Sequence, residues 1–236
     1  ATGKVRFVGD PVAVVVAVVV SGILTTLWVG RLLGIAPTQR LLIACGFSIC
    51  GAAAVAAVDG VIDADEDEVV AAVGLVVAFG TAAMALVPLA ASLLGMSPGL
   101  TGLWAGASIH EVAQVVAVGG SLGVSALHTA VVVKLARVLL LAPVMATVGI
   151  GVRRRHATAG KQPPVIPLFV LGFLAMVTLR SVGWVPDAVV PVASTMQTVL
   201  LSAAMFALGT GARLASFGRL GAAPVVLGAV STLVVS

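Results

Sequence analysis

Long apolar runs dominate this sequence and constrain its fold more than any other feature. Eight runs approach the about 20 residues that an α-helix needs to cross the hydrocarbon core of a bilayer. They cover residues 12–33, 41–58, 69–94, 100–118, 126–152, 164–182, 188–208 and 220–235. A backbone in lipid must satisfy its own hydrogen bonds, and these runs are too long for the strands of a membrane β-barrel. We therefore predict an all-α, polytopic membrane protein with about eight transmembrane helices.

The composition excludes most soluble classes of protein. Apolar residues make up 60% of the chain and charged residues 9%, whereas an average soluble domain has roughly 45–50% and about 25%. Too few polar side chains remain to cover a surface that faces water. An ordinary soluble enzyme, a disordered protein and a nucleic-acid-binding module are therefore excluded, and the lipid bilayer is the expected partner. Cys45 and Cys50 are too few for a disulfide framework.

Charges between the runs predict how the chain is oriented. If the eight spans alternate in direction, eight cations share one side of the membrane. They are Arg31, Arg40, Arg153, Arg154, Arg155, Lys161, Arg213 and Arg219. Since Lys and Arg concentrate in cytoplasmic loops, we expect this side to face the cytoplasm of a bacterial plasma (inner) membrane. The acidic run 63–68 is expected on the opposite side, as a solvated loop that begins a helix rather than as a cation site.

Three glycine-containing segments interrupt the apolar runs, at residues 46–51, 106–111 and 207–211. Glycine and hydroxyl residues within a span are typical of broken helices that line a cavity in transporters. The alternative for each segment is close helix packing through small residues. The first segment favours a break, because its two glycines bracket the polar Ser48.

Four ionisable residues are predicted at membrane depth: His110, Glu111, Lys134 and Arg137. Such residues are costly to bury, so they face cavities, pair with one another and serve a function. Lys134 and Arg137 are three positions apart and share a helix face. His110 and Gln114 are four apart and are also expected to share one, with Glu111 rotated about 100° away. We expect Glu111 to pair with one of the two cations, either beside a cavity or as an ion pair that only joins two helices.

Known catalytic motifs are incomplete or missing. The string from His110 to Gln114 matches the zinc-protease pattern H-E-x-x-H except at its last position, where an amide replaces the second imidazole. An intramembrane metalloprotease is therefore a weak alternative. The sequence also lacks the phosphate-binding loop of nucleotide hydrolases. We predict that the protein is not an enzyme and holds no metal or cofactor.

Four strings resemble the YeiH family, whose members are described as sulfate exporters. They are residues 48–52, 102–115, 133–138 and 207–212, and Ser-Ile-His-Glu-Val-Ala-Gln within the second is the most specific. The resemblance covers essentially the whole chain. It implies a fold similar to that of bile acid/sodium symporters, with two inverted repeats of five helices and a crossing pair of broken helices.

The family pattern has about two more helices at its amino end, so we expect this chain to lack them. On that mapping, residues 10–95 hold the last three helices of the first repeat and residues 99–236 the five helices of the second. The runs at 41–58 and 188–208 would be the crossing pair. The string 209–211 departs from the more polar, asparagine-containing stretch that is often seen in the family.

The predicted function is a secondary active transporter that exports a small inorganic or sulfonate anion, such as sulfate or sulfite. The predicted substrate-binding residues are Ser48, Cys50, Gly51, Ser108, His110, Gln114, Lys134, Arg137, Gly209 and Thr210. Glu111 and His110 would couple transport to protons, because both side chains titrate. The alternatives are a sodium-coupled symporter of an organic anion and a membrane scaffold or sensor without transport activity. A homodimer is compatible with each of them.

Overall fold

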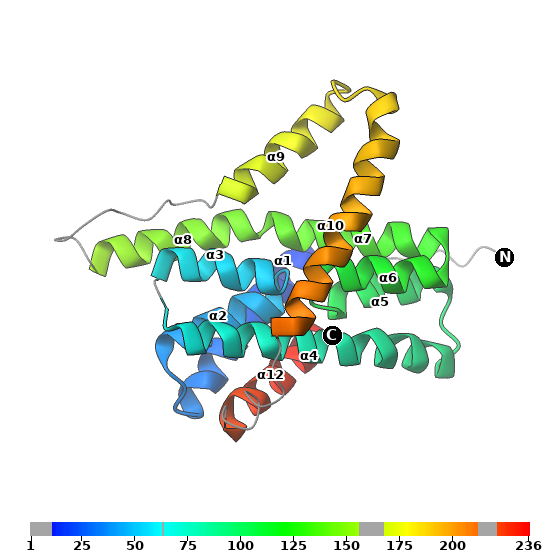
Figure 1. The fold of residues 1–236 in the computed structure, drawn as a ribbon. Coiled ribbons are helices and arrows are strands. Elements are labelled where there is room, and N and C mark those ends of the chain that lie inside the picture. Colours follow the sequence, from blue (N-terminus) through cyan, green and yellow to red (C-terminus); the bar gives the residue numbers. More distant parts are fainter. Residues whose placement is uncertain (1–10, 63, 156–167, 212–220) are drawn as a thin grey trace.

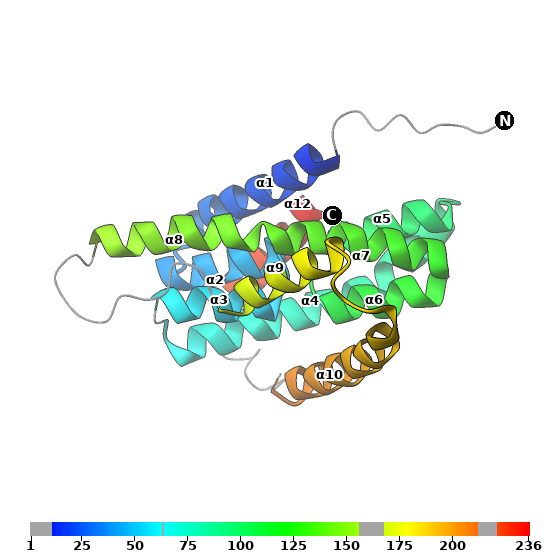
Figure 2. The same ribbon diagram turned by 90° about the horizontal axis from the view of Figure 1, so that it is seen from above.

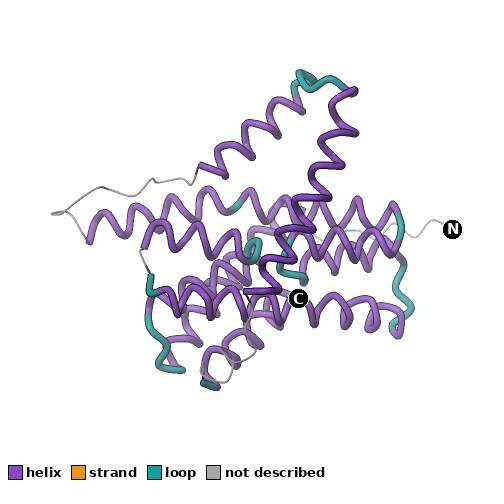
Figure 3. The backbone as a smooth tube through the Cα atoms, viewed as in Figure 1, coloured by secondary structure: helices purple, strands orange, loops and turns teal. Residues whose placement is uncertain are grey.

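The computed structural model describes residues 11–62, 64–155, 168–211 and 221–236, and every regular element in these ranges is a helix (Figures 1 and 3). The helices are α1 (Pro11–Leu32), α2 (Pro37–Ser48), α3 (Ala52–Ile62), α4 (Glu66–Leu93), α5 (Pro98–Ser108), α6 (Val112–Leu122), α7 (Val124–Leu139), α8 (Leu141–Arg155), α9 (Leu168–Ser181), a 3-10 turn (Asp187–Val189), α10 (Val190–Gly211) and α12 (Ala222–Val235). Each predicted apolar run falls on one helix or on two consecutive helices. The prediction of an all-α, polytopic membrane protein is confirmed.

Within the described residues, three apolar stretches are long enough to cross a membrane, and they form the frame of the molecule. They are Ala13–Leu32 in α1, Glu66–Leu93 in α4 and Val124–Arg154 in α7 and α8. Twenty helical residues measure about 30 Å, which is the thickness of the hydrocarbon core. Figures 1 and 2 show that α4 runs in one direction, while α1 and the α7–α8 pair run in the other.

α2 and α3 form a helical hairpin, here called hairpin 1, that returns to the end of the molecule at which it enters (Figure 1). Three residues separate the two helices. Gly51 closes the turn with a φ of 76°, which glycine adopts without strain, and its N–H donates to Gly46 O at 2.9 Å. Gly46 also packs against Val55 of α3. The predicted break at 46–51 is confirmed, but it reverses the chain instead of interrupting a span.

α5 and α6 form a second hairpin, hairpin 2, which enters from the opposite end (Figure 2). α5 lies parallel to α7, and α6 runs back antiparallel to it. The contacts that establish these directions are Gly102 with Ala126, Gly106 with Ala130, and Gly119 with Leu127. Both alternatives for 106–111 therefore apply, because the segment is a turn between two half-length helices and Gly106 also packs closely against α7.

The two hairpins correct the predicted arrangement of charges. Because hairpin 1 returns to its starting end, the loop before α4 lies at that same end, beside the loop that follows α1 (Figure 1). The acidic residues Asp65 to Glu68 therefore share an end with Arg31 and Arg40, and α8 also finishes there with Arg153 and Arg154. We call this end of the molecule the charged end. The turns at the other end, 94–97 and 123, contain no charged residue.

The remaining helices pack around this frame. α12 lies antiparallel to α1, with Leu227 against Gly30 and Val235 against Gly22. α9 and α10 form an arm in Figure 1, and α10 contacts α4 and α6. α10 is one continuous helix to Gly211, so of the two alternatives for 207–211 the described backbone rules out a break. The partner of hairpin 1 is hairpin 2, and not the run at 188–208.

Candidate functional site

The tips of the two hairpins meet in the middle of the molecule, beside α7 and α12. The place where they meet is called the central site, and it comprises Phe47, Ser48 and Ala52 of hairpin 1, Ala107, Ser108, His110 and Glu111 of hairpin 2, Lys134 and Arg137 of α7, and Thr232 of α12. Its ionisable side chains are all buried. The structure therefore brings together the four ionisable residues that the sequence places at membrane depth.

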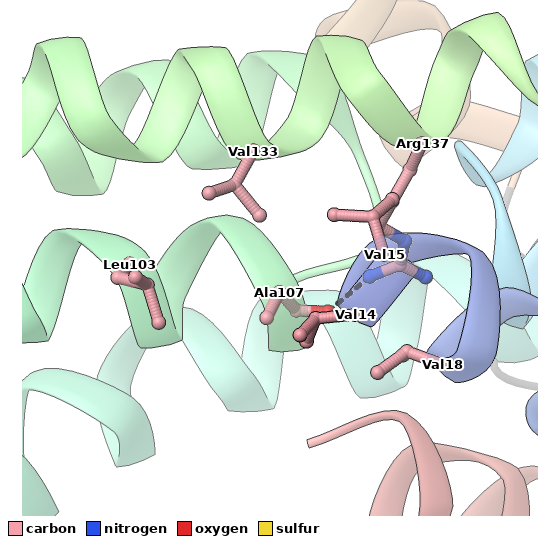
Figure 4. A pocket seen from close by; sticks show the side chains of 7 residues that line it. All are labelled: Val14, Val15, Val18, Leu103, Ala107, Val133 and Arg137. Atoms are coloured by element: carbon pink, nitrogen blue, oxygen red, sulfur yellow. Dashed lines mark hydrogen bonds between the residues drawn. The ribbon is translucent and has the colours of Figure 1, made fainter. Parts of the chain in front are cut away.

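Arg137 caps the carboxyl-terminal ends of both α2 and α5. Its Nε donates to Ser48 O at 3.1 Å, and its Nη2 donates to Phe47 O at 2.8 Å. Its Nη1 donates to Ala107 O, a bond drawn in Figure 4. The last carbonyls of a helix have no partner within that helix, and the helix dipole favours a cation beside them. One guanidinium therefore fastens both hairpins to α7.

His110 joins the tip of hairpin 2 to hairpin 1 and to α12. Its Nδ1 lies 3.2 Å from Phe47 O, and its Nε2 lies 3.1 Å from Thr232 Oγ1. A backbone carbonyl only accepts hydrogen bonds, so Nδ1 carries a hydrogen in this arrangement. The imidazole also packs on the Phe47 ring, with 4.6 Å between the ring centroids.

Glu111 places its carboxylate at the amino-terminal end of α3. Its Oε1 accepts the N–H of Ala52, the first residue of that helix, at 2.5 Å. A side chain at Gly51 would collide with this carboxylate, so glycine is needed there for space as well as for its positive φ. No ion pair joins Glu111 to Lys134 or Arg137 in the described part of the chain. The predicted pairing is therefore wrong, because a helix N–H takes the place of the cation.

Lys134 and Arg137 share one face of α7, as predicted, but they differ in how many of their N–H donors make hydrogen bonds. The Lys134 side chain is fully buried, and its Nζ makes one long hydrogen bond, 3.4 Å to His110 O. An ammonium group has three N–H donors. Arg137 binds three carbonyls, whereas Lys134 keeps donors that the described residues leave without an acceptor.

Ser48 and Ser108 occupy equivalent places in the two hairpins. Each is the third residue of a Gly-x-Ser-Ile string, and each ends the first helix of its hairpin. Both hydroxyls are buried and have no hydrogen-bond partner among the described residues. Such groups are rare in folded proteins and need an explanation. The repeated string is a signal that identifies the two hairpins as a matched pair.

Gln114 lies between the tip of hairpin 2 and α4. Its Nε2 donates to Thr81 Oγ1 at 3.3 Å, and its Oε1 accepts the N–H of Glu111 at 3.4 Å. The expectation that His110 and Gln114 share a helix face is wrong, because α5 ends at Ser108 and α6 begins only at Val112. The two side chains therefore point to different helices.

The other predicted substrate residues are distributed differently. Cys50 and Gly51 lie buried in the turn of hairpin 1. Gly209 and Thr210 belong to the last turn of α10, and the surroundings of these two residues lie outside what the structure describes. Thr232 was not predicted, although adjacent hydroxyl residues in an apolar run could have signalled it. Its neighbour Ser231 bonds Thr26 of α1 at 2.8 Å, which holds α12 in place.

A small cavity of about 100 Å³ borders the central site between α1, α5 and α7 (Figure 4). It is lined by Val14, Val15, Val18, Leu103, Ala107, Val133 and Arg137. Arg137 is the charged side chain of this set, and it reaches in from α7 to the end of α5. An apolar wall lowers the local polarity and so strengthens the hydrogen bonds of Arg137 to the helix ends.

Comparison with known proteins identifies the family. A family described as conserved hypothetical protein 698 matches residues 3–228. A UPF0324 membrane protein of Corynebacterium glutamicum is 56% identical over 226 residues, which are 95% of this chain and 66% of that protein. The inner membrane protein YeiH of Salmonella typhimurium is 39% identical over 190 residues, 79% of this chain and 54% of that protein. The membrane protein TauZ of Paracoccus pantotrophus is 37% identical over 222 residues, 92% and 66% of the two chains.

No solved structure matches the chain. The chain spans two thirds or less of the length of these three relatives. The family match and the identities nevertheless cover most of the chain, and the relatives are named as membrane or inner membrane proteins. The resemblance seen in the sequence is confirmed: the chain belongs to the UPF0324 family of membrane proteins, which includes YeiH.

Proposed function

We propose that this chain forms the substrate-binding core of a secondary active transporter that exports a small anion, such as sulfate, sulfite or a sulfonate, across the plasma membrane. The observation that carries this proposal is Lys134, a fully buried cation with one long hydrogen bond where the hairpin tips meet. Buried charges within a membrane protein mark the paths of substrates and ions. An anion is the ligand that would satisfy this ammonium.

The charge balance of the central site also favours an anion. Counted as formal charges at pH 7, Lys134 and Arg137 contribute two positive charges and Glu111 one negative charge, a sum of +1 (2 − 1 = +1) with His110 neutral. The helix dipoles cancel, because α2 and α5 end at this site while α3 and α6 begin there. A negatively charged substrate would neutralise the remaining positive charge of the central site.

The same contacts favour a proton over sodium as the coupling ion. A sodium site in a broken helix uses free backbone carbonyls. Here the carbonyls of Phe47, Ser48 and Ala107 bind Arg137. Glu111 and His110 remain as groups that could carry a proton.

The two hairpins suggest how the site would open to each side in turn. Hairpin 1 enters from the charged end and hairpin 2 from the other end, so movement of either tip would expose the central site to one side only. The units α1 with hairpin 1 and α4 with hairpin 2 run in opposite directions (Figure 1), as in inverted repeats. We place the charged end in the cytoplasm, because it carries most of the described Lys and Arg residues outside the central site.

Anion flux in vesicles that contain the purified protein tests the proposal. Lys134→Met keeps the length of the side chain and removes its charge, and we expect sulfate or sulfite flux to disappear while the protein stays folded. Arg154→Met is the control, since it removes an exposed cation at the charged end. Unchanged flux in Lys134→Met would refute the assignment of Lys134. A wild-type protein that moves none of these anions would favour the scaffold or sensor alternative.

Cysteine labelling tests the sidedness. Cys45 and Cys50 are buried, so they should react little with a reagent that cannot cross the membrane. We expect Glu66→Cys and Arg154→Cys to be labelled from the same, cytoplasmic side. Labelling from opposite sides would contradict the hairpin topology, and labelling of both from outside would reverse the orientation.

A further inference from the structure

Glu111 already occupies a place suited to an anion. Its Oε1 accepts the N–H of Ala52 at the start of α3, and Glu111 is itself the residue that precedes the first turn of α6. The starts of two half-length helices therefore lie close to one carboxylate. Free N–H groups and the positive end of the dipole make a helix start a binding place for anions.

Two other groups of the central site have hydrogen-bond donors that the Glu111 carboxylate does not satisfy. Lys134 donates to the carbonyl of His110, the residue directly before Glu111, and yet it makes no ion pair with the carboxylate. Its remaining N–H donors have no acceptor among the described residues. Ser108 ends α5 three residues before Glu111, and its buried hydroxyl also has no partner there. These groups would be satisfied by a ligand with several oxygen atoms.

We propose that the Glu111 carboxylate is an internal anion, which stands in the place of one substrate oxygen and must be displaced before an oxyanion binds. This inference rests on the proposed transport function and specifies its substrate class and coupling. In the structure described here, the internal anion holds the Ala52 N–H and the two hairpin tips are in contact.

A proton drives the exchange. It passes from water to a carboxylate oxygen of Glu111, and the neutral carboxyl group becomes a weaker acceptor for the Ala52 N–H. An oxygen of the substrate anion then accepts this N–H. When the substrate leaves on the other side, the proton returns to water and the carboxylate takes back the N–H. One proton and one oxyanion therefore cross in the same direction, and they move outward when the outward gradient of the anion exceeds the opposing proton gradient.

Few other groups near Glu111 can titrate. Cys50 of hairpin 1 and Lys134 of α7 interact with its charge, and His110 of hairpin 2 and Arg137 of α7 belong to the same central site. The described parts of α4 and α12 contribute no ionisable side chain at this depth. A pH response that disappears when Glu111 is changed would therefore belong to Glu111.

Sulfate binding and sulfate flux at several pH values test the inference. Binding is read as thermal stabilisation of the purified protein, which rises with ligand concentration over Kd. We expect the wild-type protein to bind sulfate more tightly as the pH falls. Glu111→Gln should bind it roughly tenfold more tightly than wild type at neutral pH, the worth of one charge-assisted hydrogen bond, and without pH dependence. Asp67→Asn makes the same chemical change at an exposed carboxylate and should behave as wild type.

Ala52→Pro tests the same inference from the other partner of the hydrogen bond, and it applies even if Glu111→Gln does not fold. Ala52→Pro removes the N–H that both anions would use, and proline is tolerated in the first turn of a helix. We expect its sulfate affinity to fall at every pH. Wild-type pH dependence in Glu111→Gln, or unchanged affinity in Ala52→Pro, would overturn the inference and leave the transport function standing. A wild-type protein that neither binds nor moves sulfate, sulfite or ethanesulfonate at any pH would overturn both.

Discussion

The two hairpins share one plan and differ at their tips. Both begin with a proline, both have half-length helices, and both carry the Gly-x-Ser-Ile string before the turn. The turn of hairpin 1 continues with Cys50 and Gly51, whereas that of hairpin 2 continues with His110 and Glu111. Hairpin 1 therefore offers backbone groups to the central site, and hairpin 2 supplies ionisable side chains that bind them. The two hairpins therefore have similar backbones, and the groups at their tips bind one another.

The hairpins also differ in how they are packed. Gly102 and Gly106 bring α5 onto the backbone of α7, and contact between two backbones cannot relax by a change of rotamer. Gly46 of hairpin 1 instead meets the side chains of Val55 and Val76. We therefore expect a side chain added at these glycines to be tolerated less well in hairpin 2 than in hairpin 1.

The largest expected effect comes from the residue that joins both hairpins. Arg137→Met leaves carbonyls at the ends of α2 and α5 without a donor, and loss of a partner in a buried charged network costs about 3–5 kcal/mol. The melting temperature in detergent should fall steeply, while Arg154→Met should change it little. If the two variants had the same melting temperature, Arg137 would not be the residue that links the hairpins.

The difference in packing predicts the next effect. Gly106→Ala drives a methyl group into the backbone of Ala130, whereas Gly46→Ala meets valine side chains that can shift. Overpacking costs about 1–3 kcal/mol, and we expect Gly106→Ala at the upper end of that range and Gly46→Ala at the lower end. Thermal unfolding of both variants provides the comparison. The reverse order would show that the contact of Gly106 with the backbone of α7 relaxes more easily than the contact of Gly46 with the two valines.

The turn of hairpin 1 gives a smaller and more specific effect. Gly51 and Gly95 both have positive φ, but only Gly51 lies against the Glu111 carboxylate, and open space surrounds Gly95. A left-handed conformation costs a non-glycine residue about 1–2 kcal/mol. Gly95→Ala should lose that amount of stability, and Gly51→Ala should lose more and also alter sulfate binding. Equal losses of stability in the two variants, with unchanged sulfate binding, would show that the Glu111 carboxylate does not require a glycine at position 51.

The smallest effect on stability is expected for the matched serines. Ser48→Ala and Ser108→Ala remove hydroxyls that have no partner in the described structure, so the free energy of unfolding should change by about 0.5 kcal/mol or less. Sulfate affinity should nevertheless fall if these hydroxyls face the substrate. A large loss of stability without any loss of affinity would assign the serines to packing.

Much of the central site could be read from the sequence. Ionisable residues are so rare in the apolar runs that His110, Glu111, Lys134 and Arg137 were identified as one set, and the structure brings them together. The spacing of Lys134 and Arg137 correctly predicted a shared helix face. Their partners could not be predicted, because backbone N–H and C=O groups have no signature in the sequence. The same limit explains why Glu111 was paired with a cation instead of with the N–H of Ala52.

The sequence by itself determined the membrane class, the apolar segments that form helices, the family and the two interruptions at 46–51 and 106–111, since each depends on local composition or on a local string. Only the tertiary structure decided that the chain reverses at both of these interruptions, which places Asp65 to Glu68 at the end that carries Arg31 and Arg40. A hairpin of two half-length helices and a single span contain the same number of apolar residues. The contact of Gly46 with Val55 distinguishes them in hairpin 1, and the contacts of Gly106 with Ala130 and of Gly119 with Leu127 do so in hairpin 2. These contacts exist only in the folded chain.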